Sequence, residues 1–205
     1  MTRKEFEKLC NTIANNTSEG PEHAKWTFWQ WMQQDQREFW FMMEHVSKIT
    51  PSPKRILEIG SAHGAGLIFW DRVVGSDGQV VSINFTDPPH LHQWTMDYST
   101  CTSDMHFIAD DSHKPEVLEQ VKSIFTGPID FIFIDGDHSY KGVKQDFEMY
   151  SPLVRKGGLV GFHDTNYGDG PDLIPSEQKV GDYFNDLDMP KDKIALSHGT
   201  GVVFL

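Results

Sequence analysis

Short apolar segments recur along the chain at intervals of roughly 20 to 30 residues, with helix-like stretches between them. The five segments are "RILEI" (55–59), "QVVSI" (79–83), "MHFIA" (105–109), "DFIFI" (130–134) and "GLVGF" (158–162). This rhythm is typical of βα units, which build a mostly parallel sheet. The first four segments are continuous apolar runs, so we expect strands that are covered on both faces. A chain of 205 residues fits one such domain.

The C-terminal part has a different pattern. "VGDYFNDL" predicts a short helix, and "KIALSHGTGVVFL" predicts two strands around a His-Gly-Thr-Gly turn. The sheet should therefore end in an antiparallel edge hairpin. The preceding stretch, "NYGDGPDLIPSEQ", is rich in Gly, Pro and Asp and predicts a surface loop.

Residues 1–50 precede the first strand, and 21–49 within them predict a long, aromatic-rich helical segment. Four of the six tryptophans lie in it: Trp26, Trp29, Trp31 and Trp40. Such rings can pack the segment onto the sheet as part of the same domain. They can also line a pocket as a helical lid, or serve a homo-oligomer interface. The sequence leaves these alternatives open.

Charge and cysteine content limit the classes of partner. The 18 basic and 30 acidic residues give a formal net charge of −12, which disfavours a nucleic-acid surface. The start "MTRKEFEKLC" lacks the apolar core of a secretion signal, and no run is long enough for a membrane span. Cys10 and Cys101 form no disulfide framework and no metal-ligand spacing, so we expect reduced thiols in a cytoplasmic protein.

The stretch "ILEIGSAHGAG" follows the first strand and opens a helix. Gly60 and Gly64 let the backbone approach a ligand closely. The loop does not match Gly-x-Gly-x-x-Gly, the pattern of dinucleotide-binding loops, because Ala62 occupies the position of the second glycine. This disfavours NAD-linked chemistry. The pattern instead resembles the loop of class I S-adenosylmethionine-dependent methyltransferases. That resemblance assigns the cofactor to this loop, with contacts at Glu58, Gly60, Ser61, Ala62, His63 and Gly64.

Two further positions match that family in part. At the end of the second strand the family usually carries an acid for the ribose hydroxyls. This chain has Asn84 there, whose amide can still hydrogen-bond the ribose, so we assign Asn84 to the cofactor. After the third strand, "IADDSH" resembles the stretch with which this family binds the adenine amino group. This resemblance assigns Asp111 and Ser112 to the cofactor. Asp111 could equally cap the helix that begins near Lys114.

The resemblance is most specific in "DFIFIDGDHSYKGVKQDFEMYSPLVRKGGLVGFHDT". These residues resemble small O-methyltransferases of the cephalosporin hydroxylase and rhamnosyl O-methyltransferase type, over residues 53–166. The resemblance implies a Rossmann-like, doubly wound, seven-stranded and mostly parallel sheet over residues 51–205. It also implies methyl transfer from S-adenosylmethionine to an oxygen of a sugar or small hydroxylated metabolite.

Asp135 ends the fourth strand, while His163 and Asp164 end the fifth. Ligands of doubly wound sheets bind at the carboxyl ends of the strands, so these side chains should converge. Two carboxylates and an imidazole suit a divalent ion, which the resemblance identifies as Mg²⁺, with Mn²⁺ as the alternative. Asp135 would also contact the cofactor and take part in catalysis, and His138 would be the general base. Each residue taken singly could equally be part of an ordinary polar turn.

Two rival functions stay open. A histidine with two acids could hold iron(II), as in a non-haem iron hydroxylase, and this chemistry does not need the Gly60 loop. The chain could also be a non-catalytic subunit that binds a nucleoside, and the amide at Asn84 is its best support.

Overall fold

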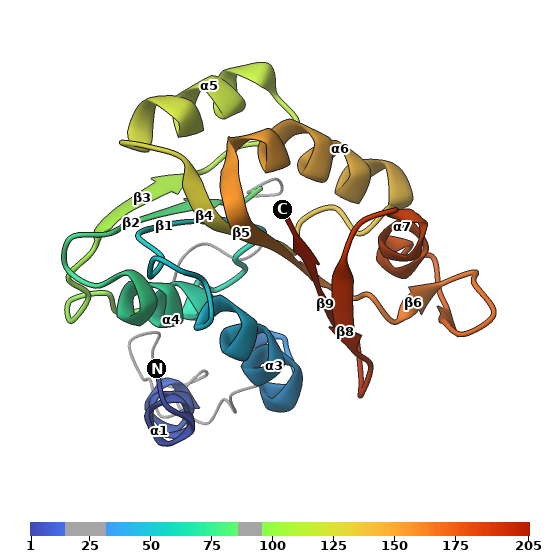
Figure 1. The fold of residues 1–205 in the computed structure, drawn as a ribbon, viewed down its shortest axis with the longest axis horizontal. Helices are drawn as coiled ribbons and strands as arrows, with labels where there is room; N and C mark the ends of the chain where they lie inside the picture. The colour runs from blue at the N-terminus through green and yellow to red at the C-terminus, as the bar shows by residue number, and fades with distance from the viewer. Residues whose placement is uncertain (15–31, 86–95) are drawn as a thin grey trace.

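A seven-stranded sheet with helices on both faces is the centre of the computed structural model (Figure 1). The structure describes residues 1–14, 32–85 and 96–205. Its strands are β1 (Arg55–Ile59), β2 (Gln79–Ile83), β3 (Asp104–Ile108), β4 (Ile129–Ile134), β5 (Val154–His163), β8 (Lys191–Ile194) and β9 (Thr200–Phe204). Their order is β3-β2-β1-β4-β5-β9-β8. The first five strands in this order are parallel to one another, and β9 is antiparallel to both of its neighbours. The predicted Rossmann-like sheet with an antiparallel edge hairpin is confirmed.

Helices cover the two faces of the sheet and enclose two apolar cores. On one face lie α1 (Arg3–Ala14), α3 (Gln36–Val46) and α4 (Ala65–Val74), and on the other α5 (Pro115–Ile124), α6 (Tyr140–Tyr150) and α7 (Val180–Asp186) (Figure 1). Successive side chains of a strand point to opposite faces. Phe131 of β4 accordingly joins the core under α3 and α4, while Ile132 joins the core under α6. This double coverage explains the continuous apolar run of β4.

Two strands differ from the prediction. β3 is the edge strand, only Ile108 in it is buried, and Phe107 is 40% exposed, so the expectation of coverage on both faces is wrong for this strand. β5 begins at Val154 and not near Gly158. The strand continues because Gly157 adopts a left-handed φ of 79°, and the pairing register with β4 shifts between Ile129 and Phe131.

The N-terminal region is interrupted where one helix was expected over residues 21–49. The chain leaves helical geometry at residues 33–35, where Gln33 has a φ of 55°, and α3 then starts behind Asp35. The Asp35 carboxylate accepts a hydrogen bond from the Arg37 amide (2.8 Å) and so caps α3. Trp40 packs on Phe6 of α1, with 5.0 Å between ring centroids. Trp26, Trp29 and Trp31 lie outside the described residues, so the lid stays a prediction.

The connections near the C-terminus carry short additional elements. A 3-10 turn, η1 (Ser151–Leu153), joins α6 to β5. The expected loop 166–178 contains a two-stranded pair, β6 (Tyr167–Gly168) and β7 (Ile174–Pro175). Among the described residues, no helix has the length and apolar character that crossing a membrane requires.

Candidate active site

A cavity of about 890 Å³ opens at the carboxyl ends of the parallel strands. Its walls come from the loops after β1, β2, β3, β4 and β5, together with the β8–β9 turn. Ten of the predicted site residues line it: Gly60, Ala62, His63, Asn84, Asp111, Ser112, Asp135, His138, His163 and Asp164. The structure therefore brings the residues expected to bind cofactor and those expected to bind metal into one space.

The loop after β1 packs directly on the loop after β4. A Cβ atom at Gly60 would lie 2.0 Å from the Asp135 carbonyl oxygen, and Gly60 has a φ of 81°. No other residue type fits both conditions. The turn is closed by a hydrogen bond of 2.6 Å from the Gly64 amide to the Ser61 carbonyl, while Ala62 takes a φ of 45°. The backbone of this loop is thus fixed close to Asp135.

Three residues of the predicted cofactor set lie behind the cavity wall. The Ser61 hydroxyl is 2.6 Å from that of Ser82, and the Gly64 carbonyl accepts a hydrogen bond from Tyr98 (3.1 Å). The Glu58 carboxylate points to α4, where it accepts a hydrogen bond from the Trp70 indole (3.0 Å). Burial, together with the negative charge of Asp135, raises the pKa of Glu58 to about 8. In this structure Glu58 supports the loop through α4.

Asn84 and Asp111 form the opposite wall. The buried Asn84 amide donates a hydrogen bond to the Ala62 carbonyl (3.2 Å) and so links the β2 end to the first loop. Asp111 accepts a hydrogen bond from the His113 amide (2.9 Å), and the residue at the N-cap of α5 is Lys114. Asp111 therefore shapes the loop before α5 and does not cap the helix.

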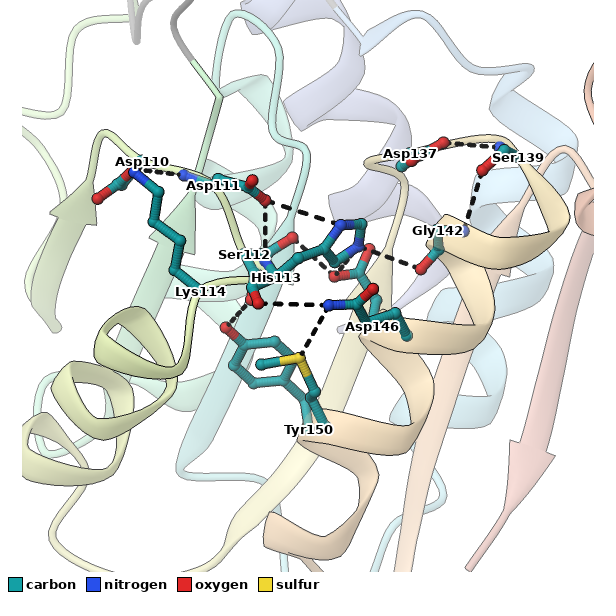
Figure 2. A network of polar contacts seen from close by, with 12 residues as sticks. Asp110, Asp111, Ser112, His113, Lys114, Asp137, Ser139, Gly142, Asp146 and Tyr150 are labelled. Carbon is teal, nitrogen blue, oxygen red and sulfur yellow. Dashed lines mark hydrogen bonds and ion pairs between the residues drawn. The ribbon is translucent and has the colours of Figure 1, made fainter.

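A buried residue of α6, Asp146, holds that loop in place (Figure 2). Its Oδ1 accepts a hydrogen bond from the Ser112 hydroxyl (2.7 Å) and lies 3.3 Å from the His113 Nε2 atom. Tyr150, one turn further along α6, donates to the Ser112 carbonyl (2.7 Å). The hydrogen bond to Asp146 is the main reason that the pKa of His113 is raised. Sequence reasoning missed Asp146, because one polar residue in an amphipathic helix carries no signal of burial.

At the other end of the cavity, the three side chains expected to converge lie close together, and that of His138 joins them. The Asp135 Oδ1 atom lies 3.1 Å from His163 Nδ1 and 3.3 Å from His138 Nε2. On its other side, His138 Nδ1 lies 3.1 Å from Asp164 Oδ2. One oxygen each of Asp135 and Asp164 and a nitrogen of His163 lie within 4.8 Å of one another, a spacing that suits a divalent cation.

The surroundings of this cluster shift the pKa values of its two carboxyl groups in opposite directions. Burial alone would raise the pKa of Asp135, but the charge of His163 and the hydrogen bonds from both histidines hold it well below its usual range. Burial instead dominates at Asp164 and raises its pKa. Burial opposes the charged form of His138, but the Asp135 carboxylate outweighs it and raises the pKa of His138 to about 9. For His163 the same balance gives a raised pKa.

Four residues near this cluster were not predicted. Gln34 donates to the second Asp135 oxygen (3.2 Å), and the Gln178 amide lies 3.1 Å from His138 Nδ1. Glu38 and His198 approach His163 from α3 and from the β8–β9 turn. These residues are far from the motif in sequence, and no local pattern could have indicated them.

The comparisons with known proteins agree with this geometry. A family profile described as a methyltransferase domain matches residues 57–165. The rhamnosyl O-methyltransferase of Mycobacterium leprae is 27% identical over 139 residues, which cover 66% of this chain and 58% of that protein. The chain thus spans less than two thirds of that relative's length.

Two solved structures show the same fold. An O-methyltransferase from Bacillus cereus in complex with SAH is 16% identical, with a TM-score of 0.61 over 100% of this chain and 92% of that one. The MycE methyltransferase of the mycinamycin biosynthetic pathway, in complex with Mg and SAH, is 19% identical, with a TM-score of 0.57 over 97% and 54%. The sheet therefore has the Rossmann-like fold of these methyltransferases. More particularly, this chain belongs to the methyltransferase domain family whose profile matches it over half its length.

Proposed function

We propose that the protein transfers a methyl group from S-adenosylmethionine to a hydroxyl of a sugar or small hydroxylated metabolite, with the help of a divalent cation. One observation carries the proposal: the loop at Gly60 and the cluster around His138 line the same cavity. The iron hydroxylase alternative does not require the loop at Gly60, whereas the proposed methyl transfer requires both this loop and the cluster around His138.

The residues at the Gly60 end fit the cofactor. S-adenosylmethionine, when bound, supplies a methyl group on a sulfonium that a nucleophile can attack. The backbone of the loop at Gly60 to His63, where it lines the cavity, would hold its amino-acid part. Asn84 would contact the ribose, and Asp111 would accept from the adenine amino group. Because Ser112 and His113 are tied to Asp146, the adenine side of the cavity is preformed (Figure 2).

The residues at the other end fit a cation. Asp135, His163 and Asp164 would hold Mg²⁺ or Mn²⁺, and the Asp164 Oδ1 atom, which is buried, has no hydrogen-bond partner among the described residues. A cation at this point lowers the pKa of a hydroxyl that binds to it. The rhamnosyl O-methyltransferase relative and the magnesium in the MycE complex support this part of the proposal.

His138 would accept the proton of the acceptor hydroxyl. Its side chain is 33% exposed and lines the cavity, so a substrate can reach it. With both neighbouring carboxylates negative, its pKa of about 9 keeps the imidazole protonated at neutral pH. Neutralising Asp135 and Asp164, as cation binding does, removes the cause of this shift. We therefore expect His138 to act as a base only when the carboxylates are neutralised.

Calorimetric titration with S-adenosylhomocysteine tests the proposal. We expect micromolar binding, and NAD⁺ as the control nucleotide should not bind because Ala62 breaks its fingerprint. An acceptor screen with labelled methyl groups then follows, in Mg²⁺ and again in excess chelator. No binding of S-adenosylhomocysteine would refute methyl transfer. Turnover that is unchanged by chelator would refute the role of the cation.

The remaining expectations belong to the same proposal. We propose a small-molecule or sugar acceptor, since the net charge of −12 disfavours nucleic acid. A cytoplasmic location and a homo-oligomeric state stay predictions, which fractionation of cells and sedimentation of the purified chain would check.

A further inference from the structure

A second set of ligand-type side chains lies behind the cluster at Asp135. One carboxylate oxygen of Glu38 and one ring nitrogen each of His163 and His198 lie within 4.8 Å of one another. They come from three separate elements: α3, the end of β5, and the turn between β8 and β9. His163 thus belongs to both sets, while Glu38 and His198 belong to this one alone.

Glu38 is held in place by its backbone contacts. It is fully buried, and its Oε1 atom accepts hydrogen bonds from the amides of Leu196 (2.8 Å), Ser197 (2.6 Å) and Gly199 (3.0 Å). These bonds fix the carboxylate against the β8–β9 turn. The other oxygen, Oε2, is buried and has no hydrogen-bond partner among the described residues.

Other buried polar atoms around this junction also lack protein partners. The His163 Nε2 atom has none among the described residues, nor have the hydroxyls of Thr165 and Thr200. Thr200 pairs with His163 across the two strands, and Thr165 adjoins Gly199. A buried polar group without a partner destabilises the folded protein, so several at one junction indicate a polar or charged group that binds there.

His198 completes the set on the cavity side. Its ring stacks on that of His163, with centroids 5.6 Å apart and an angle of 21°, and its Nδ1 atom lies 2.9 Å from the Ser197 hydroxyl. His198 and His163 both line the cavity, so an ion can reach this position from solvent.

We propose that Glu38, His163 and His198 form a binding site for a transition-metal ion such as Co²⁺ or Zn²⁺. Two imidazoles and one carboxylate suit these ions, whereas the set of two carboxylates at Asp135 suits harder cations. Both sets use His163: its Nδ1 atom lies 3.1 Å from Asp135 in the first set, and its Nε2 atom is the nitrogen left for the second. The inference does not rest on methyl transfer.

The test is a titration of the chelator-treated protein with Co²⁺ in excess Mg²⁺, followed by visible ligand-field absorption. Wild type should bind Co²⁺, and His198→Phe, which keeps an aromatic ring without the nitrogen donor, should bind it about 10-fold more weakly or worse. His45→Phe is the matched control, because His45 is another imidazole, on α3, and lies 3.3 Å from Asp192. It should bind Co²⁺ as wild type does.

Glu38→Gln is the second variant, since the glutamine oxygen can still accept from the three amides. Pulsed EPR of Cu²⁺-loaded wild type provides a readout without any variant: two coordinated imidazoles agree with the site. The proposal is overturned if wild type takes up no Co²⁺ in excess Mg²⁺, or if His198→Phe and Glu38→Gln bind it unchanged. S-adenosylhomocysteine binding by wild type is measured on the same samples, so that a failure of methyl transfer is seen separately.

Discussion

The two ends of the cavity are built in different ways. At the Gly60 end, the wall consists of tight backbone turns and of short-range hydrogen bonds such as that from Asn84 to Ala62. At the His138 end are four buried or half-buried ionisable groups, each of which lies 3.1 to 3.4 Å from two of the others. The first end is formed largely by backbone groups and hydrogen-bonded side chains, which suits recognition of a nucleoside. The second concentrates charge where proton transfer would occur, so substitutions at the two ends should have different effects.

The largest expected effect is at the charged end. His138→Ala should lower turnover by about 10²- to 10⁴-fold, because it removes the proposed proton acceptor, and should leave S-adenosylhomocysteine affinity unchanged. Steady-state rates and calorimetry measure the two quantities. His106→Ala, at an imidazole on the edge strand β3, is the control and should change neither. Full turnover in His138→Ala would contradict the assignment of His138 as the general base.

A smaller effect is expected where α6 supports the cofactor end. Asp146→Asn keeps the shape but removes the charge that faces His113, so we expect a loss of about 2–3 kcal/mol in the free energy of unfolding. Affinity for S-adenosylhomocysteine should fall as well, because Ser112 lines the cavity. Urea unfolding and calorimetry would show this. Glu148→Gln, at an exposed position of the same helix, is the control. Equal stability of the two variants would contradict the stabilising role of the Asp146 contacts.

Glu58 links the two ends and should make stability depend on pH. Its pKa is about 8 when folded and near 4.5 when unfolded, so the unfolded chain loses this proton first as pH rises. The contribution of Glu58 to stability is therefore fully present below pH 4.5 and is lost as pH rises to about 8, by a few kcal/mol. Glu58→Gln should flatten this part of the profile, measured by urea unfolding across the interval. The exposed Glu44→Gln should follow the wild-type profile, and a Glu58→Gln profile as steep as wild type would contradict the burial argument.

The smallest effect is expected at Asn84. Asn84→Ala removes one neutral hydrogen bond to the first loop and a proposed ribose contact, so affinity for S-adenosylhomocysteine should fall by about 1 kcal/mol. Calorimetry can resolve this change. Asn11→Ala, on the exposed side of α1, serves as the control. An unchanged affinity in Asn84→Ala would place the ribose elsewhere.

The sequence predicted those parts of the site that follow from local pattern and from the geometry of parallel strands. Asp135, His163 and Asp164 could be brought together in advance, because neighbouring strand ends meet at one edge of the sheet. Glu38, Gln34 and His198 could not, because their positions depend on how α3 and the β8–β9 turn pack on that edge. The break at residues 33–35 was not predicted, although Asp35 is of a residue type that often caps helices.

The antiparallel direction of β9 has a practical consequence. Thr200, at the start of β9, lies beside His163 at the cavity edge, whereas Leu205 pairs with Gly157 and Gly158 at the opposite edge of the sheet. A purification tag or fluorescent fusion attached after Leu205 would therefore extend away from the cavity. Surface immobilisation through that point should leave the cavity open to ligands in solution.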